Sequence, residues 1–131
     1  MYKIETRPSG FLLTFGGFIQ KQEMEQWLEE SSKTLLIAPP EFGVIIDMRK
    51  LKPLPQDAQE IMVKGQQMYK MKGMKRSVVI LDNPTTTFQF KRLAKESGIY
   101  AFERYIDASI MPDWSQAAVD WVNSGIDPDK K

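Results

Sequence analysis

Two short, unbroken apolar runs constrain the fold of this chain more than any other feature. Phe42-Gly43-Val44-Ile45-Ile46 ends in Asp47, and Ser77-Val78-Val79-Ile80-Leu81 ends in Asp82. Runs of this length, rich in β-branched residues, are typical of strands that are covered on both faces in a parallel sheet. Parallel neighbours need a crossover connection, so a helix is expected between them. The two runs therefore predict an α/β fold.

The segments between the strands show the periodicity of amphipathic helices. Four segments carry apolar residues at the spacing of one helix face: Lys21 to Leu35, Ala58 to Met71, Phe90 to Ser97 and Trp114 to Val122. Pro and Gly stand at their boundaries, as in the loop from 52 to 56. We therefore expect about four helices, each burying one face against the sheet.

The remaining strands follow from alternation of apolar and polar residues. Strands at about 2–7 and 11–17 flank Arg7-Pro8-Ser9-Gly10, a stretch with turn geometry, and Tyr100 to Ile106 alternates as a last strand. The predicted order is β-β-α-β-α-β-α-β-α, an antiparallel hairpin that feeds a parallel core in one mixed sheet. We assign residues 1–125 to one domain and 126–131 to a flexible polar tail.

Composition removes most enzyme mechanisms. The chain has no Cys and no His, so thiolate nucleophiles, cysteine-ligated metals and the usual neutral-pH proton carrier are missing. Lys and Arg number 18 against 17 Asp and Glu, so the chain has almost no net charge and no overall electrostatic field that would attract nucleic acid. No signal peptide or integral membrane segment is evident. We expect a non-catalytic protein without a cofactor or metal, located in a bacterial cytoplasm.

Several short motifs in this order resemble the STAS domain, the fold of bacterial anti-sigma-factor antagonists. They are Ile45-Ile46-Asp47, Val78-Val79-Ile80 before a Pro, Lys91-Arg92-Leu93 and Ser97-Gly98-Ile99. The end of the chain is similar to uncharacterised bacterial STAS-like proteins, through Arg104-Tyr105-Ile106-Asp107 and Ala118-Val119-Asp120-Trp121-Val122. The resemblance implies a regulatory or protein-interaction role.

The chain departs from the family at its working surface. Antagonist members carry a phosphorylatable Ser after the central strand, but the equivalent stretch from Lys50 to Ala58 holds neither Ser nor Thr. Gln56 or Asp57 occupies that neighbourhood. Asp57 fits a helix cap, and a permanent carboxylate there is also able to imitate the phosphorylated state. The family's phosphoswitch is not expected here.

Polar residues collect where the strands should end. In open α/β sheets ligands bind at the carboxyl ends of the strands. The candidates for this ligand edge are Asp47, Arg49, Asp82, Thr85, Thr86 and Thr87. The Asp residues are also common turn or cap residues, and the Thr run also fits a helix start.

Other residues suggest a protein interface. Val63, Met71 and Phe88 fall outside the apolar helix faces, and Met adapts to varied partners. A basic stretch without any nucleic-acid motif comprises Lys64, Lys70, Lys72, Lys75 and Arg76. It fits a solvated helix face, or a surface that meets the acidic helix from Lys21 to Leu35 of a second copy.

Two functions from different classes remain. The first is a STAS-like module that binds another protein or itself, with a homodimer as one form, through residues that include Asp57, Val63, Met71 and Phe88. The alternative is a carrier or sensor of a small apolar or lipid-like ligand, because Met and Trp are frequent on the helix faces.

Overall fold

A computed structural model describes residues 1–130, which form a five-stranded sheet covered by four α-helices. The strands are β1 (Tyr2–Arg7), β2 (Gly10–Gly17), β3 (Phe42–Leu51), β4 (Met74–Leu81) and β5 (Glu103–Asp107). The helices are α1 (Lys21–Thr34), α2 (Gln56–Met71), α3 (Pro84–Ser97) and α4 (Trp114–Ser124), with 3-10 turns at Leu35–Ile37 and Tyr100–Phe102. The predicted fold class and element order are confirmed.

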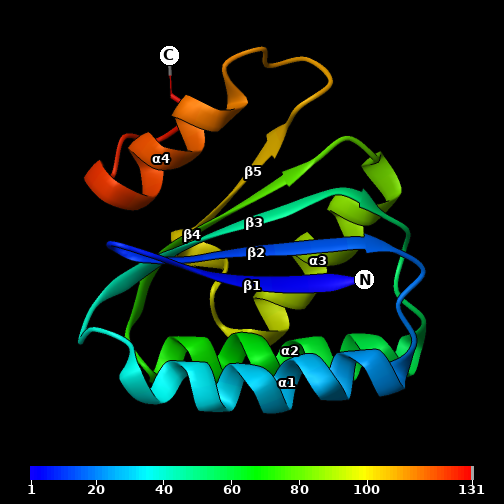
Figure 1. The fold of residues 1–131 in the computed structure, drawn as a ribbon. Helices are drawn as coiled ribbons and strands as arrows, with labels where there is room; N and C mark the ends of the chain where they lie inside the picture. Colours follow the sequence, from blue (N-terminus) through cyan, green and yellow to red (C-terminus); the bar gives the residue numbers. More distant parts are fainter. Residues whose placement is uncertain (131) are drawn as a thin grey trace.

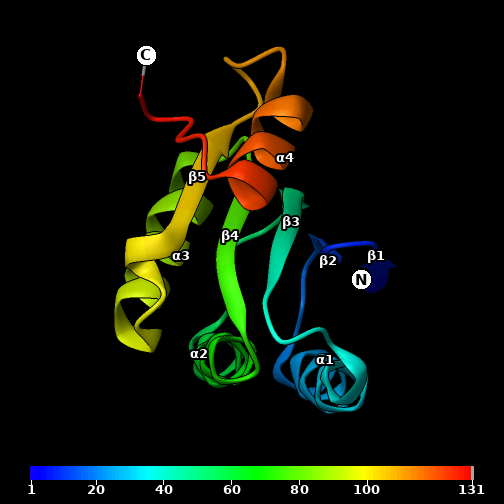
Figure 2. The same ribbon diagram turned by 90° about the vertical axis from the view of Figure 1, so that its left-hand side faces the viewer.

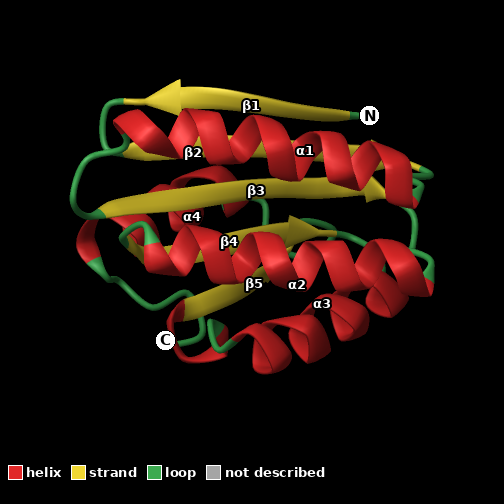
Figure 3. Cartoon of the chain, turned by 90° about the horizontal axis from the view of Figure 1, so that it is seen from below, coloured by secondary structure: helices red, strands yellow, loops and turns green. Residues whose placement is uncertain are grey.

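The strands lie in the sheet in the order of the chain. β1 pairs antiparallel with β2, and all later neighbours are parallel. Right-handed crossovers that always step in the same direction keep their helices on one side, and α1, α2 and α3 all cover the same face (Figure 3). Helix α4 follows the last strand and lies on the opposite face (Figures 1 and 2).

The two faces bury cores of unequal size. The main core, between the sheet and α1 to α3, includes Phe15, Trp27, Phe90 and Leu93. There α1 and α2 approach so closely that a Cβ on Gly65 would lie 2.2 Å from the Trp27 ring. The small core joins α4 to β4 and β5 through Val78, Ile80, Ile106, Ala118 and Trp121.

Several strand boundaries differ from the sequence-based prediction, and two of the differences concern the candidate site. β3 does not end at Asp47 but continues to Leu51, because Met48 and, after a register shift in β3, Leu51 keep filling the main core. The last strand begins at Glu103 rather than Tyr100, since Tyr100–Phe102 form a 3-10 turn. Asp47 and Arg49 are therefore residues of the sheet itself, on the face that carries α4.

The segment after α4 folds back toward β5. The N–H of Ile126 donates to the carbonyl of Asp120 at 3.2 Å, and Asp127 pairs with Arg104 of β5 at 3.0 Å. Residues 126–130 thus have specific contacts with the domain. The flexibility expected for this tail stays a prediction, and Lys131 lies outside the described residues.

Candidate functional site

The expected ligand edge begins with a fixed ion pair on β3. The guanidinium of Arg49 donates from Nε to Asp47 Oδ1 at 3.0 Å and from Nη2 to Oδ2 at 2.8 Å. Burial would raise the pKa of Asp47, but the hydrogen bonds from the Arg49 side chain and backbone outweigh it and lower that pKa. The same hydrogen bonding raises the pKa of Arg49, so the pair stays ionised at neutral pH.

Arg49 also holds the start of α4. Its guanidinium carbon lies 4.3 Å from the centroid of the Trp114 ring, a cation–π contact. Asp82 is exposed and close enough to contribute to the raised pKa of Arg49. A shallow hollow of about 550 Å³ opens beside the pair over β2 and β3, with Lys50 at its margin. Because Asp47 already neutralises Arg49, the pair offers no free charge to a ligand.

The threonine run serves the start of α3. Asn83 is the cap, since its side-chain oxygen accepts from the N–H groups of Thr85 at 2.9 Å and Thr86 at 3.3 Å. The Thr86 hydroxyl is buried and donates to the carbonyl of Leu51 at 3.4 Å. The Thr87 hydroxyl donates to the carbonyl of Asn83 at 2.9 Å. Of the three hydroxyls, only that of Thr85 is both exposed and without a hydrogen bond within residues 1–130.

The four expected interface residues lie in different places. Val63, expected outside the apolar face of its helix, is half-buried against the main core. Met71 is 85% exposed at the end of α2, and Phe88 is 75% exposed in the first turns of α3. Asp57 is exposed in the first turn of α2, where it complements the helix dipole. The expected capping role was wrong, because Pro55 takes the cap position and no side chain caps the helix.

Phe88 borders a second hollow. This hollow, of about 380 Å³, lies between α3 and the end of β5, and Pro84, Lys91 and Tyr105 are among its lining residues. Two further large apolar side chains are exposed on loops at the carboxyl ends of strands: Phe18 at 78% and Ile110 at 79%. We call Phe18, Phe88 and Ile110, together with the exposed Pro53, Pro55 and Asp57, the carboxyl-edge surface.

The loop between β3 and α2 is fastened to α3. The Gln89 side chain accepts from the N–H of Leu54 at 2.8 Å and donates to its carbonyl at 3.0 Å. Gln59 donates to the same carbonyl at 2.9 Å and accepts from Arg92. Leu54 itself is buried. The loop therefore presents Pro53 and Pro55 on a fixed backbone, with no hydroxyl that a kinase could modify.

The sequence pattern missed a buried carboxyl group at the start of β5. Glu103 is 3% exposed; its Oε1 accepts from the Ser77 hydroxyl at 3.0 Å and its Oε2 from the Tyr105 hydroxyl at 2.6 Å. Burial raises the pKa of Glu103 to about 7 despite these two hydrogen bonds. Burial and the neighbouring carboxylate raise the pKa of Tyr105, which keeps the phenol protonated as a donor.

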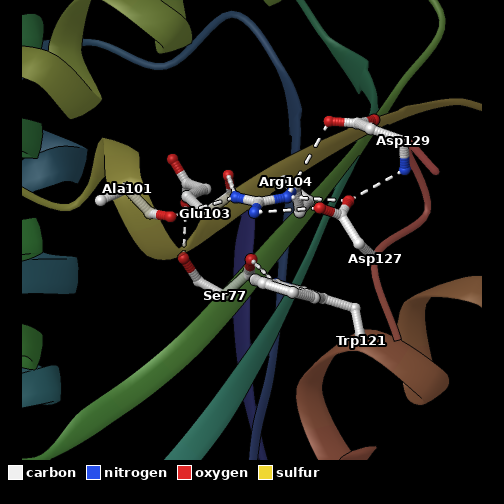
Figure 4. Close-up of polar contacts among 7 residues, drawn as sticks. All are labelled: Ser77, Ala101, Glu103, Arg104, Trp121, Asp127 and Asp129. Atoms are coloured by element: carbon white, nitrogen blue, oxygen red, sulfur yellow. Dashed lines mark hydrogen bonds and ion pairs between the residues drawn. The ribbon is translucent and has the colours of Figure 1, made fainter. Parts of the chain in front are cut away.

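The neighbouring residue, Arg104, points to the other face of β5 (Figure 4). It lies 4.2 Å from the Trp121 ring centroid and donates from Nε and Nη2 to Asp127 at 3.0 and 3.2 Å. The indole N–H of Trp121 donates to the carbonyl of Ser77 at 2.8 Å. Hydrogen bonds from Arg104 lower the pKa of Asp127. This group of contacts ties α4 and residues 126–130 to the sheet.

The interior offers little space. The cavity among Trp27, Met62, Tyr69 and Glu103 measures about 30 Å³, roughly the volume of one water molecule. Ligand pockets for small molecules are about ten times larger. An apolar ligand would enter the main core only if α1 or α2 moved away from the sheet.

The chemistry of these sites is limited. Residues 1–130 hold no group of three or more Asp or Glu side chains placed to share a metal ion. Within the same range, no helix has the length and apolar character needed to cross a bilayer. No protein-family model and no curated protein matches this sequence. What the arrangement provides is a rigid loop, exposed apolar side chains beside it, and one buried acid.

Proposed function

We propose that this chain is a non-catalytic, STAS-like protein-interaction domain that binds another protein through its carboxyl-edge surface. The observation that carries the proposal is the exposure of Phe88, at 75%, beside a hollow of about 380 Å³. An exposed aromatic ring next to a concave surface is a common anchor at protein interfaces.

The neighbouring loop supports this proposal. Gln89 of α3 holds Leu54, so the loop with Pro53 and Pro55 and the first turns of α3 with Phe88 form one rigid support. A surface that is ordered before binding loses less conformational entropy when a partner docks. The resemblance to STAS domains supports the same region, because that family uses the loop after its central strand.

In this proposal the interaction is constitutive rather than switched. Asp57 supplies a permanent negative charge in the first turn of α2, where antagonist members add one by phosphorylation. The proposal includes a cytoplasmic location, which fractionation of the source cells tests.

Affinity capture with matched variants tests the surface. Purified wild-type protein and the variants Phe88→Ser, Ile110→Ser and Ile37→Ser are each immobilised and exposed to a lysate of the source cells. Ile37 is 83% exposed on the 3-10 turn after α1, outside the carboxyl-edge surface, and serves as the control. We expect a protein that wild type and Ile37→Ser retain but Phe88→Ser and Ile110→Ser lose. Equal capture by all four would contradict the proposal.

A further inference from the structure

The outer edge of β1 carries unpaired backbone groups. The β1–β2 ladder starts with a mutual pair, in which Gly16 N–H donates to the carbonyl of Met1 at 2.9 Å and the Met1 amino group donates to Gly16 at 2.7 Å. Because such pairs alternate along an antiparallel ladder, the backbone groups of Tyr2, Ile4 and Thr6 point away from β2. Within residues 1–130, these groups have no hydrogen-bond partner across the edge.

The opposite edge of the sheet is occupied at both ends of β5. On β5 the carbonyl of Glu103 accepts from Nη1 of Arg104 at 3.1 Å, and the carbonyl of Asp107 accepts from the N–H groups of Ile110 and Met111. Only β1 therefore offers a full strand length for pairing in the described part of the chain. An unpaired edge strand is a template for a strand of another chain.

The charged side chains of β1 are complementary to those of β1 in a second copy of the chain. Lys3, Glu5 and Arg7 alternate in sign on the face that α4 leaves uncovered beyond β3. Within the chain they form only loose, exposed ion pairs, at 3.7 Å for Lys3 with Glu5 and 3.5 Å for Arg7 with Glu5. These side chains are free to choose partners across a strand boundary.

We propose that β1 pairs antiparallel with β1 of a second copy, with the two-fold axis at Ile4, so that two sheets join into one. In this register Tyr2 lies opposite the partner's Thr6, and each of the outward residues exchanges both backbone hydrogen bonds. Lys3 then lies opposite the partner's Glu5, and Glu5 opposite the partner's Lys3. Opposite charges in directly facing positions stabilise a strand pair.

The neighbouring symmetric registers are disfavoured. An axis at Glu5 would place the two Glu5 side chains together and Lys3 against the partner's Arg7. An axis at Lys3 would place the two Lys3 side chains together. Like charges in facing positions destabilise a pair. Charges on edge strands commonly prevent association. The alternating charges of Lys3, Glu5 and Arg7 instead disfavour the neighbouring registers and favour the register centred on Ile4.

Two carboxylates of the acidic helix α1 beneath the edge already have partners at the start of β1. Of the α1 carboxylates, Glu30 accepts a hydrogen bond from the Tyr2 hydroxyl at 2.9 Å, and Glu23 lies 3.2 Å from the Met1 amino group. The inference is independent of the carboxyl-edge surface, because β1 and the α3–β5 hollow lie at opposite edges of the sheet.

Charge reversal tests the register. Sedimentation equilibrium of wild type from about 10 µM to 1 mM should show a dimer. Lys3→Glu and Glu5→Lys each turn both facing pairs into like charges, and each should weaken the dimer roughly tenfold or more. Mixed in equal amounts, the two variants face each other with opposite charges, so the heterodimer should recover the wild-type dissociation constant.

A backbone variant tests the edge itself. Thr6→Pro removes an outward N–H and leaves the ladder to β2 intact, because prolines are tolerated on the free side of an edge strand. It should abolish the dimer, whereas Thr6→Val should keep it, with unchanged circular dichroism in both.

The dimer and its register can each be overturned by a different result. A wild type that stays monomeric at 1 mM overturns the proposal, and so does a dimer that survives both Lys3→Glu and Thr6→Pro. Loss of the dimer in both single charge variants without recovery in the mixture overturns the register centred on Ile4. None of these results bears on the capture experiment with Phe88→Ser.

Discussion

Tyr105 donates a hydrogen bond of 2.6 Å to Glu103 on the same face of β5, and together with Ser77 it gives this buried carboxyl group only neutral partners. No cation within residues 1–130 offsets the burial, which is why the pKa of Glu103 rises to about 7. Between pH 4.5 and about 7 the folded protein therefore keeps a Glu103 proton that the unfolded chain has already released.

The first prediction concerns pH and stability. The unfolded chain releases the Glu103 proton near its ordinary pKa of 4.5, whereas the folded chain releases it near 7. Between these values the folded state holds more protons, so the free energy of unfolding falls as pH rises, by up to about 3 kcal/mol. Urea unfolding of wild type and Glu103→Gln at pH 5 and pH 8 measures this.

Glu103→Gln should be more stable than wild type at pH 8, and its stability should change less between the two pH values. Glu25→Gln, an exposed change on α1, is the control and should keep the wild-type slope. A Glu103→Gln variant with the same pH dependence as wild type would show that the carboxyl group is already charged in the fold.

The second prediction concerns Gly65. Alanine normally stabilises a helix interior by about 1 kcal/mol relative to glycine. Here a Cβ would lie 2.2 Å from the Trp27 ring, so Gly65→Ala should instead destabilise the protein by roughly 1–3 kcal/mol. Thermal unfolding of Gly65→Ala beside Lys64→Ala, an exposed neighbour, measures the difference. An unchanged or higher Tm for Gly65→Ala would mean that α1 and α2 are further apart.

The third prediction concerns the loop that Gln89 holds. Gln89→Ala leaves the N–H of Leu54 without a partner, which should cost about 1–2 kcal/mol of stability. Amide hydrogen exchange should rise at residues 52–56 and stay unchanged in β4. Gln67→Ala, at an exposed position of α2, is the control. If amide exchange at residues 52–56 in Gln89→Ala is the same as in wild type, Gln89 does not hold the loop.

The fourth prediction concerns Arg104 and Asp127. Because hydrogen bonds from Arg104 lower the pKa of Asp127, Arg104→Gln should return that pKa toward its ordinary value. An NMR titration of the side-chain carboxyl measures it. Exchange at residues 126–130 should rise several-fold in the same variant. If the Asp127 titration is unaffected, residues 126–130 are held by other contacts.

The order of elements was predictable because it depends on local patterns. The apolar runs of β3 and β4 and the helical spacing around Trp27 and Trp121 each arise from neighbours along the chain. The crossover rule then fixes the side on which α1, α2 and α3 lie. No such rule applies to α4, because it does not connect two parallel strands of the described sheet, and its place on the other face emerged only from the structure.

The site residues were less predictable. Glu103 lies in an alternating segment, and alternation does not say which face is buried when helices cover both sides of a strand. The roles of Thr86, Gln89 and Arg104 depend on groups more than twenty residues away in the chain: two backbone carbonyls and the side chain of Asp127. Asp47 followed an apolar run, so its strand was expected to end there, but the main core extends further along β3.

The placement of α4 on a separate face also has a consequence during synthesis. When Asp107 leaves the ribosome, all five strands and α1 to α3 are available, so the main core can form at once. Val78, Ile80 and Ile106 then remain uncovered until α4 emerges. For that interval the nascent chain displays an apolar stripe that the finished protein hides, and a chaperone that recognises such stripes has a short, defined time in which to bind.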